Sequence, residues 1–132
     1  MNEVVRKWLV KAERDKGSAR LELEATPSPN FDASCFHAQQ CVEKLMKAVL
    51  IAAGAEAPKT HDLVFLAALV ARIYPSWSWQ REGLEALTRG AVRFRYPEED
   101  AMRPDAEQAV VLCEALAPTL RALLEAPPYE ST

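Results

Sequence analysis

Residues 35–50 read CFHAQQCVEKLMKAVL, and this stretch decides the fold class of the chain. At about 100° of rotation per residue, its apolar side chains gather on one arc of a helix. That arc consists of Cys35, Ala38, Val42, Leu45, Met46, Val49 and Leu50. The opposite arc is polar and carries His37, Gln40, Lys44 and Lys47. The pattern predicts an amphipathic helix that begins near Asp32, a good N-cap residue, and ends at Ala53, where Gly54 stops it.

The chain on either side of this helix shows the same helical spacing. Apolar residues three and four positions apart predict further helices over residues 2–24, 60–74, 79–90 and 104–125. Thr60 is the expected N-cap of the third helix, Pro104 suits the first turn of the fifth, and Pro118 should bend or break that helix. Strict alternation never lasts longer than about five residues, so strands are poorly supported. The sequence therefore predicts an all-α fold, an up-and-down bundle of four to five helices.

Length and composition narrow the class of protein. The 132 residues, 49% of them hydrophobic, suffice for a single domain with its own core, which we expect over residues 1–126 with a disordered tail at residues 127–132. With 16 Lys+Arg against 19 Asp+Glu the net charge is −3, which excludes a generally basic nucleic-acid binder but permits a local basic patch. The longest uncharged apolar stretch, residues 63–71, is too short to cross a membrane, and residues 1–9 do not resemble a secretory signal.

The cysteine and histidine content argues against a metal or a cofactor. Cys35, Cys41 and Cys113 are widely spaced without a CxxC pair, and the two histidines lie outside metal-motif spacing. We therefore expect no metal site and no cofactor, three buried free thiols, and a reducing, cytoplasmic setting. The chain also has no glycine-rich phosphate loop, no GxSxG and no HExxH motif.

Two polar residues interrupt the apolar stripes. Asp15 lies seven residues after Trp8 and four before Ala19, inside the stripe of the first helix, and Gln39 lies near the apolar arc of the second. A buried carboxylate or amide is costly unless it finds hydrogen-bond partners. We therefore expect structural roles, with Asp15 paired to an Arg or Lys of another helix or facing a partner subunit. A ligand-facing role is the alternative for each.

The polar arc of the second helix is the first candidate for a ligand site. Lys44 and Lys47, together with an amide and an imidazole on one helical stripe, could hold a phosphate or a nucleotide. The alternative is a solvated helix face, which the pairing of Glu43 with Lys47 four residues later would stabilise.

Residues 58–63, PKTHDL, form the second candidate. Lys59 and His61 lie beside the expected start of the third helix, where free backbone amides favour anions. Capping of that helix explains Thr60 and Asp62 but leaves His61 unexplained, which makes it the better functional candidate of the two histidines.

Residues 93–97, RFRYP, form the third candidate. If this stretch is extended, Arg93 and Arg95 point the same way, about 6.6 Å apart, and Arg89 lies one turn earlier on the preceding helix. These arginines could grip phosphates while Tyr96 stacks on a base. The alternative is that they pair with the acidic residues 98–100.

Taken together, FHAQQCVEKLMKAVL, PKTHDL and the RYP turn before the last helix resemble the HEPN domains, named from higher eukaryotes and prokaryotes nucleotide-binding. Trp8, Ala12 and Asp15 match the W…A…D arrangement of prokaryotic members, so the resemblance covers residues 4–124. It implies a helical bundle that usually forms a homodimer. Many members are encoded beside a minimal nucleotidyltransferase, and the pair acts as a toxin–antitoxin system.

The resemblance also bears on catalysis. Catalytic HEPN proteins are metal-independent RNases whose motif is an Arg followed, four to six residues later, by an acid–base His. No histidine follows Arg89, Arg93 or Arg95 here, because the last one is His61. We therefore lean away from an enzyme and expect a homodimeric module that binds a nucleotide or RNA phosphate as partner of a minimal nucleotidyltransferase. The residues expected to bind are Lys44, Lys47, Lys59, His61, Arg93, Arg95 and Tyr96.

Two alternatives to this binding module stay open. One is a metal-independent RNase that uses His61 or His37 in place of the missing histidine. The other is a purely structural antitoxin or scaffold, which would bind a neighbouring protein but no small ligand.

Overall fold

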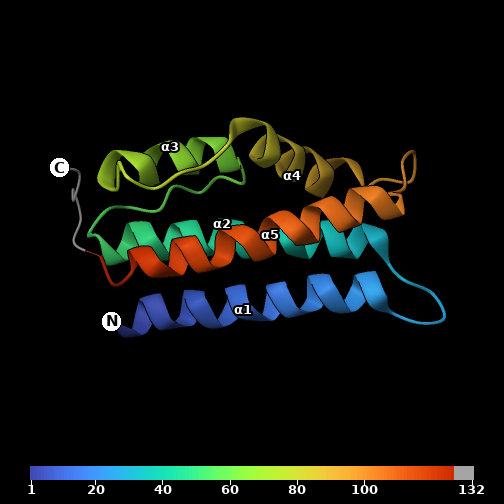
Figure 1. The fold of residues 1–132 in the computed structure, drawn as a ribbon, viewed down its shortest axis with the longest axis horizontal. Helices are drawn as coiled ribbons and strands as arrows, with labels where there is room; N and C mark the ends of the chain where they lie inside the picture. The colour runs from blue at the N-terminus through green and yellow to red at the C-terminus, as the bar shows by residue number, and fades with distance from the viewer. Residues whose placement is uncertain (127–132) are drawn as a thin grey trace.

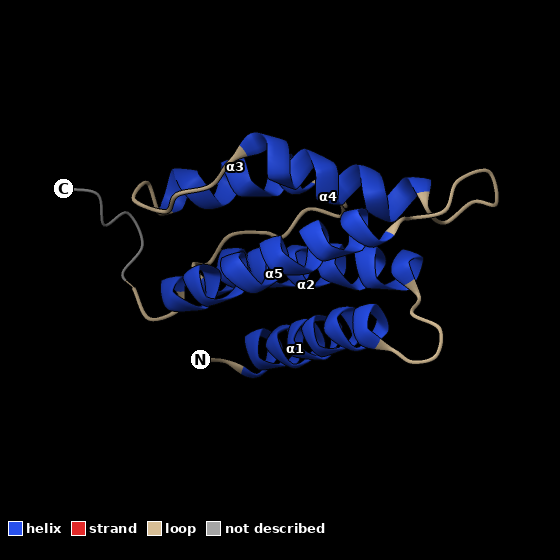
Figure 2. Ribbon diagram, turned by 45° about the vertical axis from the view of Figure 1, so that its right-hand side comes forward, coloured by secondary structure: helices blue, strands red, loops and turns tan. Residues whose placement is uncertain are grey.

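The computed structural model describes residues 1–126, and within them five α-helices and no strand make up the fold (Figures 1 and 2). The helices are α1 (Glu3–Glu24), α2 (Phe31–Ala52), α3 (Leu63–Ile73), α4 (Arg81–Arg93) and α5 (Arg103–Leu123). The long helices α1, α2 and α5 lie lengthwise beside one another, and the short helices α3 and α4 follow end to end along the upper side of the bundle (Figure 1). The all-α fold expected from the sequence is confirmed.

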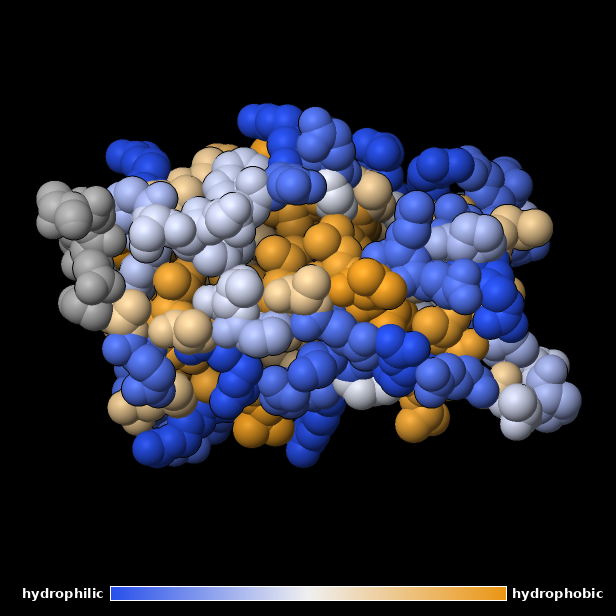
Figure 3. Space-filling view, viewed as in Figure 1, coloured by the Kyte–Doolittle hydropathy of each residue, from blue (hydrophilic) through white to orange (hydrophobic). Residues whose placement is uncertain are grey.

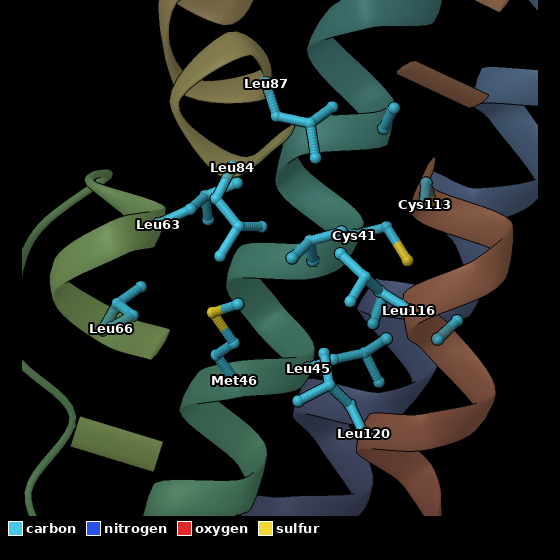
Figure 4. Packing of buried hydrophobic residues seen from close by; sticks show 14 of the residues in the cluster. Cys41, Leu45, Met46, Leu63, Leu66, Leu84, Leu87, Cys113, Leu116 and Leu120 are labelled. Atoms are coloured by element: carbon cyan, nitrogen blue, oxygen red, sulfur yellow. The ribbon is translucent and has the colours of Figure 1, made fainter. Parts of the chain in front are cut away.

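Helix α2 lies at the centre of the core. Its apolar arc is fully buried, with Ala38, Val42, Met46 and Val49 all at 0% exposure. Leucines from the surrounding helices converge on it (Figure 4): Leu63 and Leu66 from α3, Leu84 and Leu87 from α4, Leu116 and Leu120 from α5. Each fully buried side chain of this kind stabilises the fold by about 1.5–3 kcal/mol, so the packing around α2 supplies the main driving force.

The starts of α2 and α3 differ from the expected capping. Asn30, not Asp32, caps α2, since its side chain accepts a hydrogen bond from the Ala33 N–H at 3.0 Å. The Asp32 carboxylate instead accepts from the Ala101 N–H at 2.7 Å and ties the start of α2 to the segment before α5. Likewise Asp62 caps α3, and the predicted start at Thr60 is wrong by three residues. Of Asn30 and Asp32 at α2, and of Thr60 and Asp62 at α3, the residue whose side chain reaches the amide of the second or third helical residue is the cap.

The ends of the helices confirm one prediction, correct another and narrow a third. Gly54 ends α2 with φ +83°, a conformation that favours glycine. Helix α4 continues past its expected end at Gly90 to Arg93, and Phe94 forms the C-cap, so Arg93 is helical and does not belong to an extended stretch with Arg95. Of the two outcomes expected at Pro118, the break does not occur: α5 continues through this exposed proline to Leu123, and the buried residues on either side of it, Ala117 and Leu120, hold the helix against the core.

The remaining predictions of the fold concern the cysteines and the chain ends. Cys35, Cys41 and Cys113 are buried free thiols, as expected. None of the helices within residues 1–126 is long and apolar enough to cross a membrane. The tail predicted at residues 127–132 lies outside the described residues.

Candidate functional site

The predicted ligand-binding residues do not form one site. Lys44, Lys47 and His61 belong to a polar cluster along α2, here called the α2 polar seam. Arg93 lies instead at a groove between α4 and α5. Lys59, Arg95 and Tyr96 are exposed and line neither region. The α2 polar seam comprises Asp15, His37, Gln39, Gln40, Glu43, Lys44, Lys47 and His61.

One half of the seam joins α1 to α2 through Asp15. The Asp15 side chain is 11% exposed and accepts from Lys44 Nζ at 2.5 Å. His37 Nδ1 lies 2.8 Å from the other oxygen of the same carboxylate. Because an ionised carboxylate only accepts, Nδ1 carries the proton and Nε2 of His37 is the basic nitrogen. The Lys44 ammonium is therefore paired to a carboxylate of another helix.

The other half of the seam surrounds Glu43, whose side chain is 5% exposed. Its carboxylate accepts from Gln39 Nε2 at 3.1 Å and from Lys47 Nζ at 3.0 Å, and His61 Nδ1 lies 2.9 Å from it. Burial alone would raise the pKa of the Glu43 carboxyl, but the hydrogen bonds from His61, Gln39 and Lys47 outweigh burial and hold that pKa below its ordinary value. Glu43 therefore carries a buried negative charge at neutral pH.

His61 is held at two points while its ring remains open to solvent. Besides the contact with Glu43, its backbone carbonyl accepts from Gln39 Nε2 at 3.0 Å. Its side chain is nevertheless 75% exposed. The seam thus fixes an exposed imidazole with Nδ1 toward a buried carboxylate.

The seam is less solvated than a simple polar helix face would be. The Lys47 side chain is only 9% exposed, and its ammonium lies 5.9 Å from the centre of the Trp8 ring. Helix α1 and the segment before α3 cover this side of α2. Lys44 neutralises the buried carboxylate of Asp15, and Lys47 neutralises that of Glu43. Both lysines are therefore already paired with carboxylates within the protein.

The start of α3 does not offer the free amides expected there. The amides of Val64 and Phe65 donate to the Asp62 carboxylate at 3.0 and 3.3 Å. The Leu63 amide donates to Thr88 Oγ1 of α4 at 3.2 Å. These donors are satisfied within the protein, so the anion-binding corner predicted beside Lys59 is wrong in this respect.

A groove of about 410 Å³ lies between α4 and α5 and is here called the α4–α5 groove. Apolar surface gathers on this face between α5 and the layer of α3 and α4 (Figure 3). Its apolar lining comes from Cys35, Ala86, Leu87, Ala109 and Leu112, and its polar lining from Arg89, Arg93, Asp105 and Gln108. This volume falls within the range of about 300–1,000 Å³ that small-molecule sites occupy.

The arginines of the groove differ in how they are paired. Arg93 donates from Nε to the Glu99 carboxylate at 3.0 Å and from Nη2 to the same oxygen. The alternative that these arginines pair with the acidic residues 98–100 is therefore realised for Arg93 and Glu99. Arg89, one turn earlier, is exposed and forms no ion pair with any residue in the range 1–126.

The thiol at the base of the groove packs as an apolar group. Burial first, and then the nearby carboxylates of Asp105 and Asp32, together raise the pKa of Cys35 to about 12. A thiol with this pKa is protonated at neutral pH and is not a nucleophile. Among the described residues, no cluster of three or more His, Cys, Asp or Glu side chains could hold a metal ion.

Sequence reasoning missed Asp105 and Gln108, which line the groove from α5. Their spacing of three residues was visible, as was the series of small residues Gly83, Ala86 and Gly90 on α4. A Cβ at Gly83 would lie 2.8 Å from the Leu112 side chain, so this glycine lets α4 pack closely against α5. Only the fold shows that the two series face each other.

Comparison with known proteins agrees with this architecture. The chain is similar to TT1696 from Thermus thermophilus, with a TM-score of 0.75 and 23% sequence identity over 93% of this chain and 99% of that one. It is also similar to ST0689, an archaeal HEPN homologue, with a TM-score of 0.63 and 20% identity over 94% of this chain and 99% of that one. No curated protein matches the sequence. The sequence profile of the HEPN domain matches residues 5–123, nearly the whole described chain, and the chain therefore belongs to the HEPN domain family.

Proposed function

We propose that this HEPN domain is a nucleotide-binding module whose ligand lies in the α4–α5 groove. The observation that carries the proposal is the combination of an apolar floor with an unpaired arginine, Arg89, at the rim of the groove. A nucleotide needs both, because its base is a flat apolar surface and its phosphates are anions. Arginine suits phosphates best, since its planar group donates two parallel hydrogen bonds.

The distribution of paired and unpaired charge supports the groove over the α2 polar seam. A phosphate at Lys44 or Lys47 would compete with a buried carboxylate for the same ammonium charge and would be repelled by that carboxylate. Phosphate binding at the groove requires only that Arg93 give up its ion pair with Glu99 for the phosphate. The two side chains of that pair are 52% and 48% exposed. Water screens exposed ion pairs of this kind, so the exchange costs little.

Longer ligands would extend beyond the groove onto the loop that follows α4. Arg95 and Tyr96 are exposed on that loop, directly after the helix that carries Arg89 and Arg93. An RNA strand bound with one nucleotide in the groove could place its next phosphate at Arg95 and stack a base on Tyr96.

Equilibrium titration of the protein with ATP, GTP and a short RNA tests the groove as the binding site. Hydrogen bonds to charged groups contribute about 1.5–3 kcal/mol, so Arg89→Ala with Arg93→Ala should weaken binding at least tenfold. The matched control is Arg72→Ala with Arg81→Ala, which removes two exposed arginines outside the groove and should change affinity less than twofold. Equal affinity of wild type and the Arg89/Arg93 variant would overturn this site.

The finer proposal is that the module forms a homodimer and acts as partner of a minimal nucleotidyltransferase in a toxin–antitoxin-like pair. Exposed apolar side chains support an interface that involves α4 and α5, since Val92, Met102 and Val111 are 50%, 66% and 63% exposed. Analytical ultracentrifugation tests the dimer, and co-purification with the product of the neighbouring gene tests the partner. A monomer at micromolar concentration that leaves that product unbound would contradict both statements.

A metal-independent RNase is the second candidate, and one observation favours it. Both histidines of the chain hold Nδ1 against a buried carboxylate, His37 at Asp15 and His61 at Glu43. This arrangement leaves each Nε2 as the basic nitrogen for proton transfer. Purified protein that leaves RNA intact would eliminate the RNase, whereas cleavage lost in His61→Ala or His37→Ala would support it. A purely structural antitoxin or scaffold predicts neither cleavage nor ligand binding.

A further inference from the structure

The two walls of the α4–α5 groove carry different chemistry. Arg89 and Arg93 lie four residues apart on α4 and line one wall, whereas Asp105 and Gln108 lie three residues apart on α5 and line the other. At about 1.5 Å of rise per residue, each pair spans roughly one helical turn on one face. A ligand across the groove therefore meets cations on one side and an acceptor beside an amide on the other.

The polar groups of the α5 wall have spare hydrogen-bonding capacity. Asp105 uses Oδ2 to accept from the Met102 N–H at 2.8 Å, which caps the start of α5. Its Oδ1 accepts no hydrogen bond from the other described residues. The Gln108 side-chain amide is exposed and donates no hydrogen bond to the described residues. The charge of Asp105 acts inside the groove, because it adds to burial in raising the pKa of the Cys35 thiol and to the Glu99 contact in raising that of the Arg93 guanidinium.

This division orients a nucleotide. Its phosphates cannot lie against the Asp105 carboxylate without repulsion, so they lie on the α4 wall and the base lies against α5. The carboxylate then faces an edge of the base. A carboxylate accepts only, so it requires donors on that edge, and an acceptor placed there would be repelled.

We propose that Asp105 and Gln108 read the base and select guanine, which deepens the proposed function of the groove and rests on it. Guanine alone presents two adjacent donors, N1–H and the N2 amino group, which suit the Asp105 carboxylate. Its neighbouring O6 accepts from the Gln108 amide. Adenine presents one amino donor beside the N1 acceptor, and uracil presents a single N–H between two carbonyl oxygens. Each of these places an acceptor toward the carboxylate.

Titration of the full chain with GTP, ITP and ATP tests base selection, because inosine lacks only the N2 amino group. Since a hydrogen bond to a charged group is lost at each step, GTP should bind roughly tenfold tighter than ITP, and ITP tighter than ATP. Asp105→Asn keeps an acceptor for the Met102 N–H but removes the charge, and it should abolish the difference between GTP and ITP. The matched control is Glu107→Gln, which removes one charge from the same helix outside the groove and should leave the order unchanged.

Gln108→Leu is the second variant, because it leaves the cap of α5 intact. It removes the donor to O6 and should reduce the affinity for GTP and ITP while leaving that for ATP within twofold. If GTP, ITP and ATP bind with equal affinity through Arg89 and Arg93, base selection is overturned and nucleotide binding stands. If none of the three binds the wild-type protein, both the proposed function and base selection are overturned.

Discussion

Replacement of Glu43 by alanine tests whether the α2 polar seam is a buried ion network. The change leaves the Lys47 ammonium, on a side chain only 9% exposed, without its carboxylate, and it removes the acceptor shared by Gln39 and His61. Removal of one partner of a buried pair typically destabilises a protein by about 3–5 kcal/mol. Lys47 retains the Trp8 ring as a second partner, so we expect the lower end, about 3 kcal/mol. This is a large share of the roughly 5–15 kcal/mol that holds a domain folded.

Urea unfolding followed by far-UV circular dichroism measures this loss at neutral pH. A double-mutant cycle of Glu43→Gln with Lys47→Met isolates the pair, because the double variant removes both charges and should be less destabilised than the sum of the single variants. A loss below about 1 kcal/mol for Glu43→Ala, the value of an exposed pair, would refute the claim that the network is buried and coupled.

The ionised state of the same carboxylate has a consequence for pH dependence. The pKa of Glu43 is lowered in the folded state from its ordinary value of 4.5, so its contribution is fully present above that value and is lost as the pH falls through the folded pKa. Glu43→Gln should therefore flatten the acid limb of the stability curve. An unchanged acid limb would contradict the ionised state of Glu43.

Three further substitutions test the packing and the backbone. Gly54→Ala should destabilise the protein by about 1–2 kcal/mol in the same unfolding assay, because φ is +83° there; nothing lies within 4 Å of the added Cβ, so the loss comes from backbone strain and not from a clash. Gly17→Ala is its matched control within a helix and should stabilise the fold by up to about 1 kcal/mol, since its Cβ also meets nothing within 4 Å. Leu66→Ala, at a position with 0% exposure, should cost about 2–5 kcal/mol, and a smaller loss would show that the contact between α2 and α3 is loosely packed.

The sequence predicted the helices well because their stripes of apolar residues have a regular period. It failed at the caps, since Asn30 and Asp32 both suit an N-cap and the choice depends on the distant Ala101 amide that Asp32 accepts from. The predicted end of the fourth helix at Gly90 was wrong, because α4 continues to Arg93. A glycine weakens a helix without always ending it, so the local pattern alone does not fix the last helical residue.

The candidate site was harder to predict than the fold. The polar arc of α2 was visible, but that Lys44 pairs with Asp15 of α1 and that His61 reaches Glu43 follow only from which elements cover α2. The groove was invisible for the same reason, because Arg89 and Gln108 lie on different helices that the fold brings face to face. Periodicity reveals the buried face of a helix but not the neighbour of its polar face.

We propose that a nucleotide binds in the α4–α5 groove and not at the α2 polar seam. Backbone amide shifts in a two-dimensional ¹H–¹⁵N NMR titration with GTP distinguish the two locations residue by residue. The predicted result is saturable change at groove residues such as Gly90, Arg93 and Gln108, with Lys44 and Lys47 of the seam unmoved. Changes confined to the seam, or no change at any amide, would contradict the claim.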